Sequence, residues 1–278
     1  MPQHSVKPSV PVVMVLAGHD STGGAGIQAD IEALISMGCH AATVITSLTV
    51  QDTQHVHGFM PIPADQVVSQ ARAVLEDLPV AAFKIGLLGS TQNVEAIHTL
   101  LRDYPDVPVV LDPVVKSGGG DALSNDAIIA AMKTLLFPLT TILTPNSQEA
   151  RTLAPAADTL DACAHELMDL GCEYVLITGT HEATPRVTNR LYGNLRLLET
   201  YEWERLPHSY HGSGCTLASA IAGLLAQEAT PEMAVRDAQQ YTWDALHHGY
   251  RLGLGQYLPN RLFWGFDENT GRTHESDL

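Results

Sequence analysis

Residues 211–220 combine the residue types that hold an anion with one that can take part in proton transfer. Gly212, Ser213 and Gly214 let the backbone wrap tightly, and the residues after them carry apolar side chains at helical spacing. The first N–H groups of a helix have no partner inside it, and the helix dipole adds partial positive charge there. A phosphate is the simplest anion for such a place, so we predict a phosphate cradle at these three residues.

Cys215 follows the predicted cradle directly. The positive end of a helix lowers the pKa of a thiol, so we expect Cys215 to act as a base or nucleophile in group transfer. A tight turn beside a small, inert core cysteine is an equally good interpretation of this segment taken alone, because a short glycine-rich turn is a weak signal.

Carboxylates and an amide follow two apolar runs that are typical of buried strands. Asp112 comes directly after the run at 107–111, and Asn146 and Glu149 come after the run at 140–143. Asp112 is a candidate ligand of Mg²⁺, which prefers oxygen donors, or else a helix-cap or turn residue. Asn146 and Glu149 lie on one helix face, where both are within reach of a metal's water shell. The Asn-x-x-Glu spacing is also that of a helix capping box, which remains an alternative for both residues.

Other loops that follow predicted strands carry further candidates. The glycine-rich loop at 18–26 suits a flat ligand lying against bare backbone, and Asp30 either faces that loop or only stabilises its helix N-terminus. Gln51 can donate and accept hydrogen bonds together, which suits a heteroaromatic ring bearing N and NH₂, although it equally fits a glutamine that faces water. Lys116, in the loop at 116–120, either folds over a phosphate or belongs to a surface turn.

Alternating strands and helices bring these loops together. Apolar runs typical of strands lie at 10–17, 42–50, 80–85, 107–111, 140–143 and 174–177, and helical patterns lie at 27–35, 65–78, 91–101, 126–135, 160–170, 216–227 and 231–250. Residues 186–205 predict a hairpin. This alternation indicates an α/β fold with a central, mostly parallel sheet between two helical layers. The candidate loops then share the carboxyl edge of the sheet, where ligands of open parallel sheets bind.

Composition and charge exclude several function classes. Fifteen basic against thirty-one acidic residues give a formal net charge of −16, which argues against nucleic-acid binding and against docking on anionic membranes. The four cysteines lack metal-site spacing, and we expect them to be reduced. The chain has no apolar run of about 18 residues that would span a membrane, so we expect a cytoplasmic protein. We predict a single domain over residues 10–265, with flexible termini at 1–9 and 266–278.

The motifs at 17–30, 84–89, 111–114, 144–149 and 211–217 occur in the order found in a known enzyme family. Over about residues 12–250 the chain resembles the hydroxymethylpyrimidine/phosphomethylpyrimidine kinases of thiamine biosynthesis. The resemblance implies a ribokinase-like α/β/α fold, usually a homodimer, with ATP and Mg²⁺. It also implies phosphorylation of 4-amino-5-hydroxymethyl-2-methylpyrimidine and, in many members, of its monophosphate.

The resemblance assigns roles residue by residue. It implies a pyrimidine pocket lined by Gly18, Asp30, Gln51, Leu87 and Val114, an anion hole at Gly212, Ser213 and Gly214 with Cys215 as the base, ATP or phosphate contacts from Lys116, Asn146, Thr178 and Gly179, and Mg²⁺ ligation by Asp112 and Glu149. Thr178 and Gln239 stand where relatives commonly carry lysines near the ATP phosphates. Lys116 or an arginine is then the candidate replacement.

Two other functions fit the same residues. A pyridoxal or pyridoxine kinase shares the fold and motifs and also takes a flat heteroaromatic alcohol. A pyrimidine-binding protein with little catalysis would explain the lost lysines. Phosphorylation assays with both kinds of substrate would separate the three.

Overall fold

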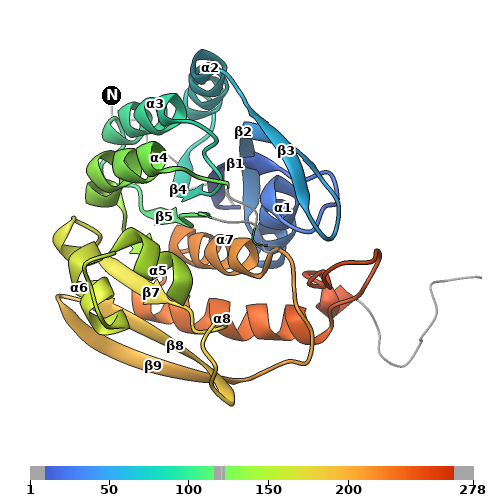
Figure 1. Ribbon diagram of the computed structural model, residues 1–278. Coiled ribbons are helices and arrows are strands. Elements are labelled where there is room, and N and C mark those ends of the chain that lie inside the picture. Colours follow the sequence, from blue (N-terminus) through green and yellow to red (C-terminus); the bar gives the residue numbers. More distant parts are fainter. Residues whose placement is uncertain (1–9, 116–119, 121–122, 266–278) are drawn as a thin grey trace, which may run out of the picture.

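A nine-stranded sheet forms the middle of the described part of the molecule, with helices on both of its faces (Figure 1). This computed structural model describes residues 10–115, 120 and 123–265. The predicted flexible termini at 1–9 and 266–278, and Lys116 with most of its loop, lie outside the described residues.

The sheet is parallel in its middle and antiparallel at both edges. Its strand order is β3-β2-β1-β4-β5-β6-β7-β8-β9. The parallel strands are β1 (Val12–His19), β2 (His40–Gln51), β4 (Val80–Ile85), β5 (Val109–Leu111), β6 (Ile142–Leu143) and β7 (Tyr174–Ile177). The edges are β3 (Val56–Pro61) and the hairpin of β8 (Arg186–Gly193) with β9 (Arg196–Glu204). The predicted parallel strands and hairpin are therefore confirmed, whereas β3 was not predicted.

The helices form two layers. One layer contains α1 (Gly26–Ser36), α7 (Ser213–Ala226) and α8 (Pro231–His247), and the other contains α2 (Ala64–Leu75), α3 (Thr91–Arg102), α4 (Asp126–Ala131), α5 (Ser147–Leu153) and α6 (Leu160–Asp169). The predicted helix at 126–135 is not uniformly α-helical, because a π-helical turn, Met132–Leu136, follows α4.

The central strand shows why both layers are needed. Along β1, Met14 and Leu16 pack into the core under α2 and α3, while Val13, Val15 and Ala17 pack under α1 and α7. These side chains are at most 1% exposed. Because successive strand residues point to opposite faces, an apolar run without polar alternation is buried on both sides.

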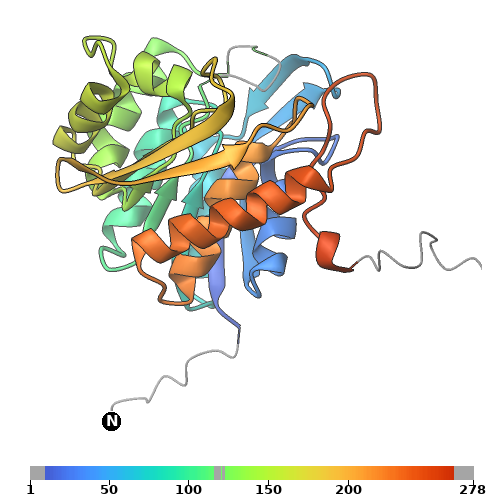
Figure 2. The same cartoon turned by 90° about the horizontal axis from the view of Figure 1, so that it is seen from below.

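Helix α7 is the most enclosed helix of its layer. It contacts β1, β4 and β5 on one side and α8 on the other, and Figure 2 shows α8 lying across it. Nearly all of its residues from Thr216 to Ala226 are buried. A helix that is apolar on all sides fits only such an interior position. Its N-terminus is thereby fixed at the carboxyl edge of the sheet.

Candidate functional site

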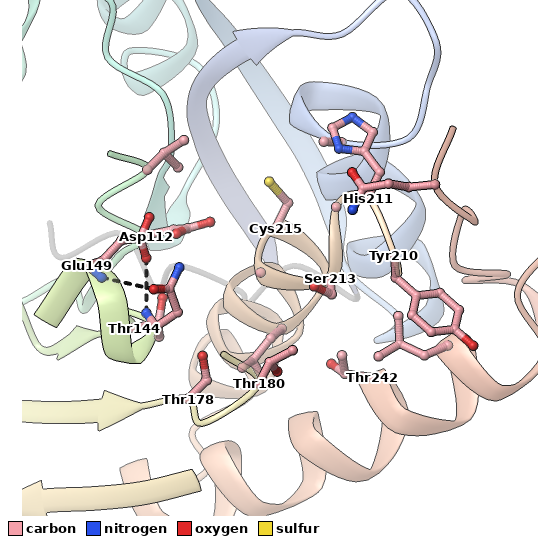
Figure 3. Close-up of a pocket in the computed structure, with 18 of the residues that line it drawn as sticks. Asp112, Thr144, Glu149, Thr178, Thr180, Tyr210, His211, Ser213, Cys215 and Thr242 are labelled. Carbon is pink, nitrogen blue, oxygen red and sulfur yellow. Dashed lines mark hydrogen bonds between the residues drawn. The ribbon is translucent and has the colours of Figure 1, made fainter. Parts of the chain in front are cut away.

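A cavity of about 540 Å³ opens at the carboxyl edge of the parallel strands. It is lined by Gly18, Gln51, Leu87, Asp112, Val114, Asn146, Glu149, Thr178, Gly212, Ser213, Gly214 and Cys215 among the predicted site residues. Asp30 and Gly179 do not line it, and Lys116 lies outside the described residues. Figure 3 shows the side chains that converge on this cavity from the strand ends and from α7 and α8.

The N-terminus of α7 presents bare backbone to the cavity. Its first intrahelical hydrogen bond runs from Thr216 N to Gly212 O at 3.0 Å, so the N–H groups of Ser213 to Cys215 precede the regular pattern. Gly212 is left-handed with φ 81°, and a Cβ added there would lie 1.9 Å from Gly24 O. Only glycine therefore fits at this position, where the cradle meets the loop between β1 and α1.

Cys215 lies at this cradle, but its protonation differs from our prediction. The side chain is half-buried and its sulfur projects from α7 (Figure 3). Burial, together with the carboxylates of Asp112 and Asp30, raises the pKa of the thiol to about 12. Lys84 and the Gly26 N–H oppose them without reversing the shift. The predicted lowered pKa is therefore wrong for the ligand-free protein, because burial and neighbouring carboxylates outweigh the helix dipole.

Asp30 is a buried ion-pair partner and does not face the glycine-rich loop. Its Oδ1 accepts hydrogen bonds from Lys84 Nζ at 2.8 Å and from Ser219 Oγ at 2.7 Å, and both charged side chains are fully buried. Burial alone would lower the pKa of Lys84, but the adjacent carboxylate of Asp30 raises it above its ordinary value. Lys84 begins the motif at 84–89 and had no role predicted from the sequence, although it lines the cavity.

Asp112 and Glu149 form a pair of interacting buried carboxyl groups. Burial, with smaller contributions from neighbouring carboxylates, raises the pKa of Asp112 to about 6 and that of Glu149 to about 7. A Cβ added to Gly214 would lie 3.6 Å from Asp112 Oδ2, so this carboxyl group faces the start of α7. Oxygen donors short of a compensating cation fit Mg²⁺, which needs only one or two carboxylates besides water and phosphate. The described residues contain no cluster of three or more ligating His, Cys, Asp or Glu side chains.

The capping box at the start of α5 is present. Asn146 Oδ1 accepts from Glu149 N at 2.9 Å, and Glu149 Oε2 accepts from Asn146 N at 3.0 Å. Glu149 Oε1 also accepts from Val115 N at 3.1 Å. Both residues nevertheless line the cavity, so capping fixes them in place rather than removing them from the site.

Asp20 and His211 are cavity residues that sequence reasoning did not single out. Asp20 Oδ2 accepts from His211 Nε2 at 2.8 Å and from Ala25 N at 2.8 Å, and Oδ1 accepts from Thr22 N at 2.8 Å. Burial would raise the pKa of Asp20, but these hydrogen bonds, with one from Gln51, lower it well below 3.8. The pair ties the loop after β1 to the residue before the cradle.

A neutral network lines the opposite end of the cavity. Gln239 Oε1 accepts from Asn189 Nδ2 at 2.8 Å and from Trp203 Nε1 at 3.2 Å. Gly179 N donates to Asn189 Oδ1 at 2.9 Å, and a Cβ on Gly179 would lie 2.1 Å from Thr188 O. The backbone N–H of Gly179 is thus engaged in packing β8, which explains why this predicted phosphate contact does not line the cavity.

Comparisons with known proteins agree on the family. The model of the phosphomethylpyrimidine kinase family matches residues 20–260. A hydroxymethylpyrimidine/phosphomethylpyrimidine kinase of Streptomyces coelicolor is 37% identical over 253 residues, which cover 88% of this chain and 92% of that protein.

Solved structures confirm the ribokinase-like three-layer fold that the resemblance predicted. An ADP complex of Bacillus subtilis pyridoxal kinase has a TM-score of 0.85 at 27% identity, covering 93% of this chain and all of that one. A phosphomethylpyrimidine kinase from Clostridium difficile has a TM-score of 0.74 at 31% identity, covering 85% of this chain and 99% of that one. With such matches in sequence and fold, this chain belongs to the phosphomethylpyrimidine kinase family.

Proposed function

We propose that this protein uses ATP to phosphorylate 4-amino-5-hydroxymethyl-2-methylpyrimidine, and then its monophosphate, in thiamine biosynthesis. The observation that carries the proposal is the N-terminus of α7, which opens into the cavity beside Cys215 and Asp112. Unpaired helix N–H groups favour a transferring phosphoryl group. The family membership supplies the substrate class.

The pyrimidine is proposed to lie against the loop after β1. Gly18, Gln51, Leu87 and Val114 line that part of the cavity. A Cβ on Gly18 would lie 2.8 Å from Ser47 Oγ and 3.0 Å from Leu87 Cδ2, so glycine there lets Leu87 pack closely against the end of β1. The Gln51 amide can pair with a ring nitrogen and an exocyclic amino group.

ATP is proposed to enter from the opposite end, between β7 and α8. Thr178 and Asn146 line the cavity there beside the start of α5, and we assign them to the phosphate chain. A related pyridoxal kinase was solved as an ADP complex, which supports a nucleotide in this fold. Lys116 remains a proposed phosphate contact.

Catalysis then depends on positioning and charge. The N–H groups of Ser213 to Cys215 hold the phosphoryl group during in-line transfer, and Cys215 takes the hydroxyl proton late in the reaction. Because its thiol pKa is raised in the free protein, Cys215 has to give its own proton to water first, and the positive charge of Lys84 and the Gly26 N–H stabilise the resulting thiolate. Asp112 and Glu149 would hold Mg²⁺, which supplies positive charge against the phosphate oxygens.

The homodimer and the cytoplasmic location remain part of the proposal. Leu48, Val50 and Met60 expose apolar surface on the β2–β3 ribbon, which suits contact with a second copy. Within the described residues, no helix has both the length and the apolar character needed to cross a membrane. A solution mass of about twice 29.9 kDa by light scattering would support the dimer.

ATP-dependent phosphorylation of the pyrimidine, its monophosphate and pyridoxal tests the function. Pyridoxal is the competing substrate because a pyridoxal kinase is among the structural relatives. We expect product from the pyrimidine and its monophosphate, with pyridoxal slower. Turnover of pyridoxal without turnover of the pyrimidine would reverse the assignment, and tight pyrimidine binding without ATP consumption would refute kinase activity.

A further inference from the structure

Arg261, near the end of the described chain, carries the largest fully buried side chain outside the cavity lining. It is only 2% exposed and reaches three segments that are distant in sequence. Its Nε donates to Thr216 Oγ1 at 2.8 Å, its Nη1 donates to Glu32 Oε2 at 3.0 Å, and its Nη2 donates to Gly24 O. One guanidinium therefore connects the glycine-rich loop, α1 and the first turn of α7.

These contacts place Arg261 directly behind the phosphate cradle. Thr216 Oγ1 donates in turn to Gly212 O at 2.8 Å, so a chain of two hydrogen bonds links the guanidinium to the residue that begins the cradle. A Cβ added to Gly212 would lie 2.8 Å from Nη2 and 1.9 Å from Gly24 O. Arg261 thus holds the two glycine backbones against each other from the side away from the cavity.

A cation at this point matters because the described cavity lining holds just two lysine or arginine side chains, Lys84 and Arg205. The formal net charge is −16, and Thr178 and Gln239 are neutral at the other end of the cavity. Lys84 is the other buried cation near α7, and the fully buried Asp30 neutralises it. The carboxylate partner of Arg261, Glu32, is 24% exposed, so water screens its charge more than it screens that of the guanidinium.

We propose that Arg261 is a positioning residue for phosphoryl transfer, resting on the kinase function proposed above. Its guanidinium fixes Gly24, Gly212 and Thr216 so that the N–H groups of α7 point at the transferring phosphoryl, and it adds positive charge behind them. Donors aimed in advance at developing charge act mainly in the transition state. The alternative is an ion pair with Glu32 that only stabilises the fold.

Matched variants separate the two accounts. Arg261→Gln removes the charge and the forked geometry, Arg261→Lys keeps the charge, and Glu32→Gln removes only the ion pair. We expect Arg261→Gln to lower kcat about 10- to 100-fold, less than loss of a direct oxyanion donor, with KM for ATP and pyrimidine within about threefold. Arg261→Lys should fall between Arg261→Gln and wild type, and Glu32→Gln should keep kcat within about twofold.

A second pair of variants, at Thr216, tests the proposal if the Arg261→Gln protein does not fold. Thr216→Val removes the hydroxyl that Arg261 contacts, and Thr216→Ser keeps it. If Arg261→Gln does not fold, a kcat loss of about tenfold or more in Thr216→Val but not in Thr216→Ser supports the proposal, and equal rates overturn it.

The remaining outcomes are also decisive. A folded Arg261→Gln enzyme with kcat within about threefold of wild type overturns the proposal, as does a Glu32→Gln enzyme that loses as much kcat. Equal kcat values for Arg261→Lys and Arg261→Gln would overturn the claim that the positive charge of Arg261 contributes to the rate. Wild-type protein that phosphorylates none of the substrates refutes the kinase function itself, which is a different result from an active wild type with unaffected variants.

Discussion

The two ends of the cavity are built from different chemistry. Around the pyrimidine end and behind the cradle lies a charged side, defined by Asp20, Asp30, Lys84, His211 and Arg261, in which Asp30 pairs with Lys84, Arg261 pairs with Glu32, and Asp20 accepts a hydrogen bond from His211. The other end is an amide side, defined by Thr178, Asn189, Trp203 and Gln239, where neutral donors and acceptors satisfy one another.

The charged side supplies the electrostatic potential of the cavity, and the amide side supplies a fixed surface of matching shape. Buried ions polarise what lies next to them because little water screens them, so the charged side sets the potential at the cradle. Amides and an indole hold a fixed surface without a strong field. Variants on the charged side should therefore change chemistry and pH dependence, whereas variants on the amide side should change nucleotide affinity.

The largest effect is expected from Lys84→Met. It leaves the carboxylate of Asp30 buried without its cation, which costs about 3–5 kcal/mol of unfolding free energy in urea titrations. The double variant Lys84→Met/Asp30→Asn, which also removes the buried carboxylate, should regain much of the stability that Lys84→Met loses. Its activity should stay low. Recovery of full activity in the double variant would show that the charged side serves folding alone.

The second largest effect is expected from Cys215→Ala, which removes the proposed base at the cradle between the charged side and the amide side. We expect kcat to fall about 100-fold with little change in KM for the pyrimidine, since a proton acceptor acts mainly in the transition state. Because the thiol pKa of the free protein is raised to about 12, the wild-type kcat/KM should keep rising with pH through the neutral range, and the variant's profile should be flatter. Equal pH profiles for both proteins would rule out Cys215 as the base.

Asp20→Asn should have an intermediate, pH-dependent effect. The pKa of Asp20 is lower in the folded than in the unfolded protein, so its carboxylate stabilises the fold above about pH 4, and this contribution is lost as the pH falls. We expect a loss of about 2 kcal/mol at pH 7 that shrinks by pH 3, measured by urea unfolding at each pH. A loss that is constant with pH would contradict the role of the charge.

The smallest effect is expected from Gln239→Met on the amide side. It removes the acceptor shared by Asn189 and Trp203 and should cost about 1–2 kcal/mol of stability. We expect a few-fold higher KM for ATP, an unchanged KM for the pyrimidine and the wild-type pH profile, measured in steady-state assays. A kcat loss matching that of Cys215→Ala would erase the distinction between the two sides.

Local pattern predicted most of the fold. The strands at 80–85 and 174–177 match β4 and β7 because short, mostly apolar runs between turn residues are typical of strands that are buried in a sheet. Strand β3 was not predicted because Gly58 and Pro61 interrupt its apolar pattern, and pairing with β2 rather than propensity forms it.

Site residues could be predicted where they directly follow a strand. They could not be predicted where their role depends on a contact with a residue distant in sequence. Asp112 and Glu149 were placed by their positions after β5 and β6. The direction of Asp30 could not be predicted, because its partner Lys84 lies 54 residues away on another strand. Arg261 had no local signal at all, since all three of its partners are distant in sequence.

The contact of Gly24 with Gly212, held by Arg261, constrains how the protein matures during its synthesis. A nascent chain on the ribosome can form β1 and α1 early. Until α7 emerges, however, the loop that contains Gly24 lacks the Gly212 segment that it packs against. Arg261 can make its hydrogen bonds to Gly24 and Thr216 only when the segment after α8 has left the ribosome. The cradle is therefore complete only once residue 261 has left the ribosome, so a translation product stopped before residue 261 would have most of the fold but lack the arginine that holds its phosphate cradle.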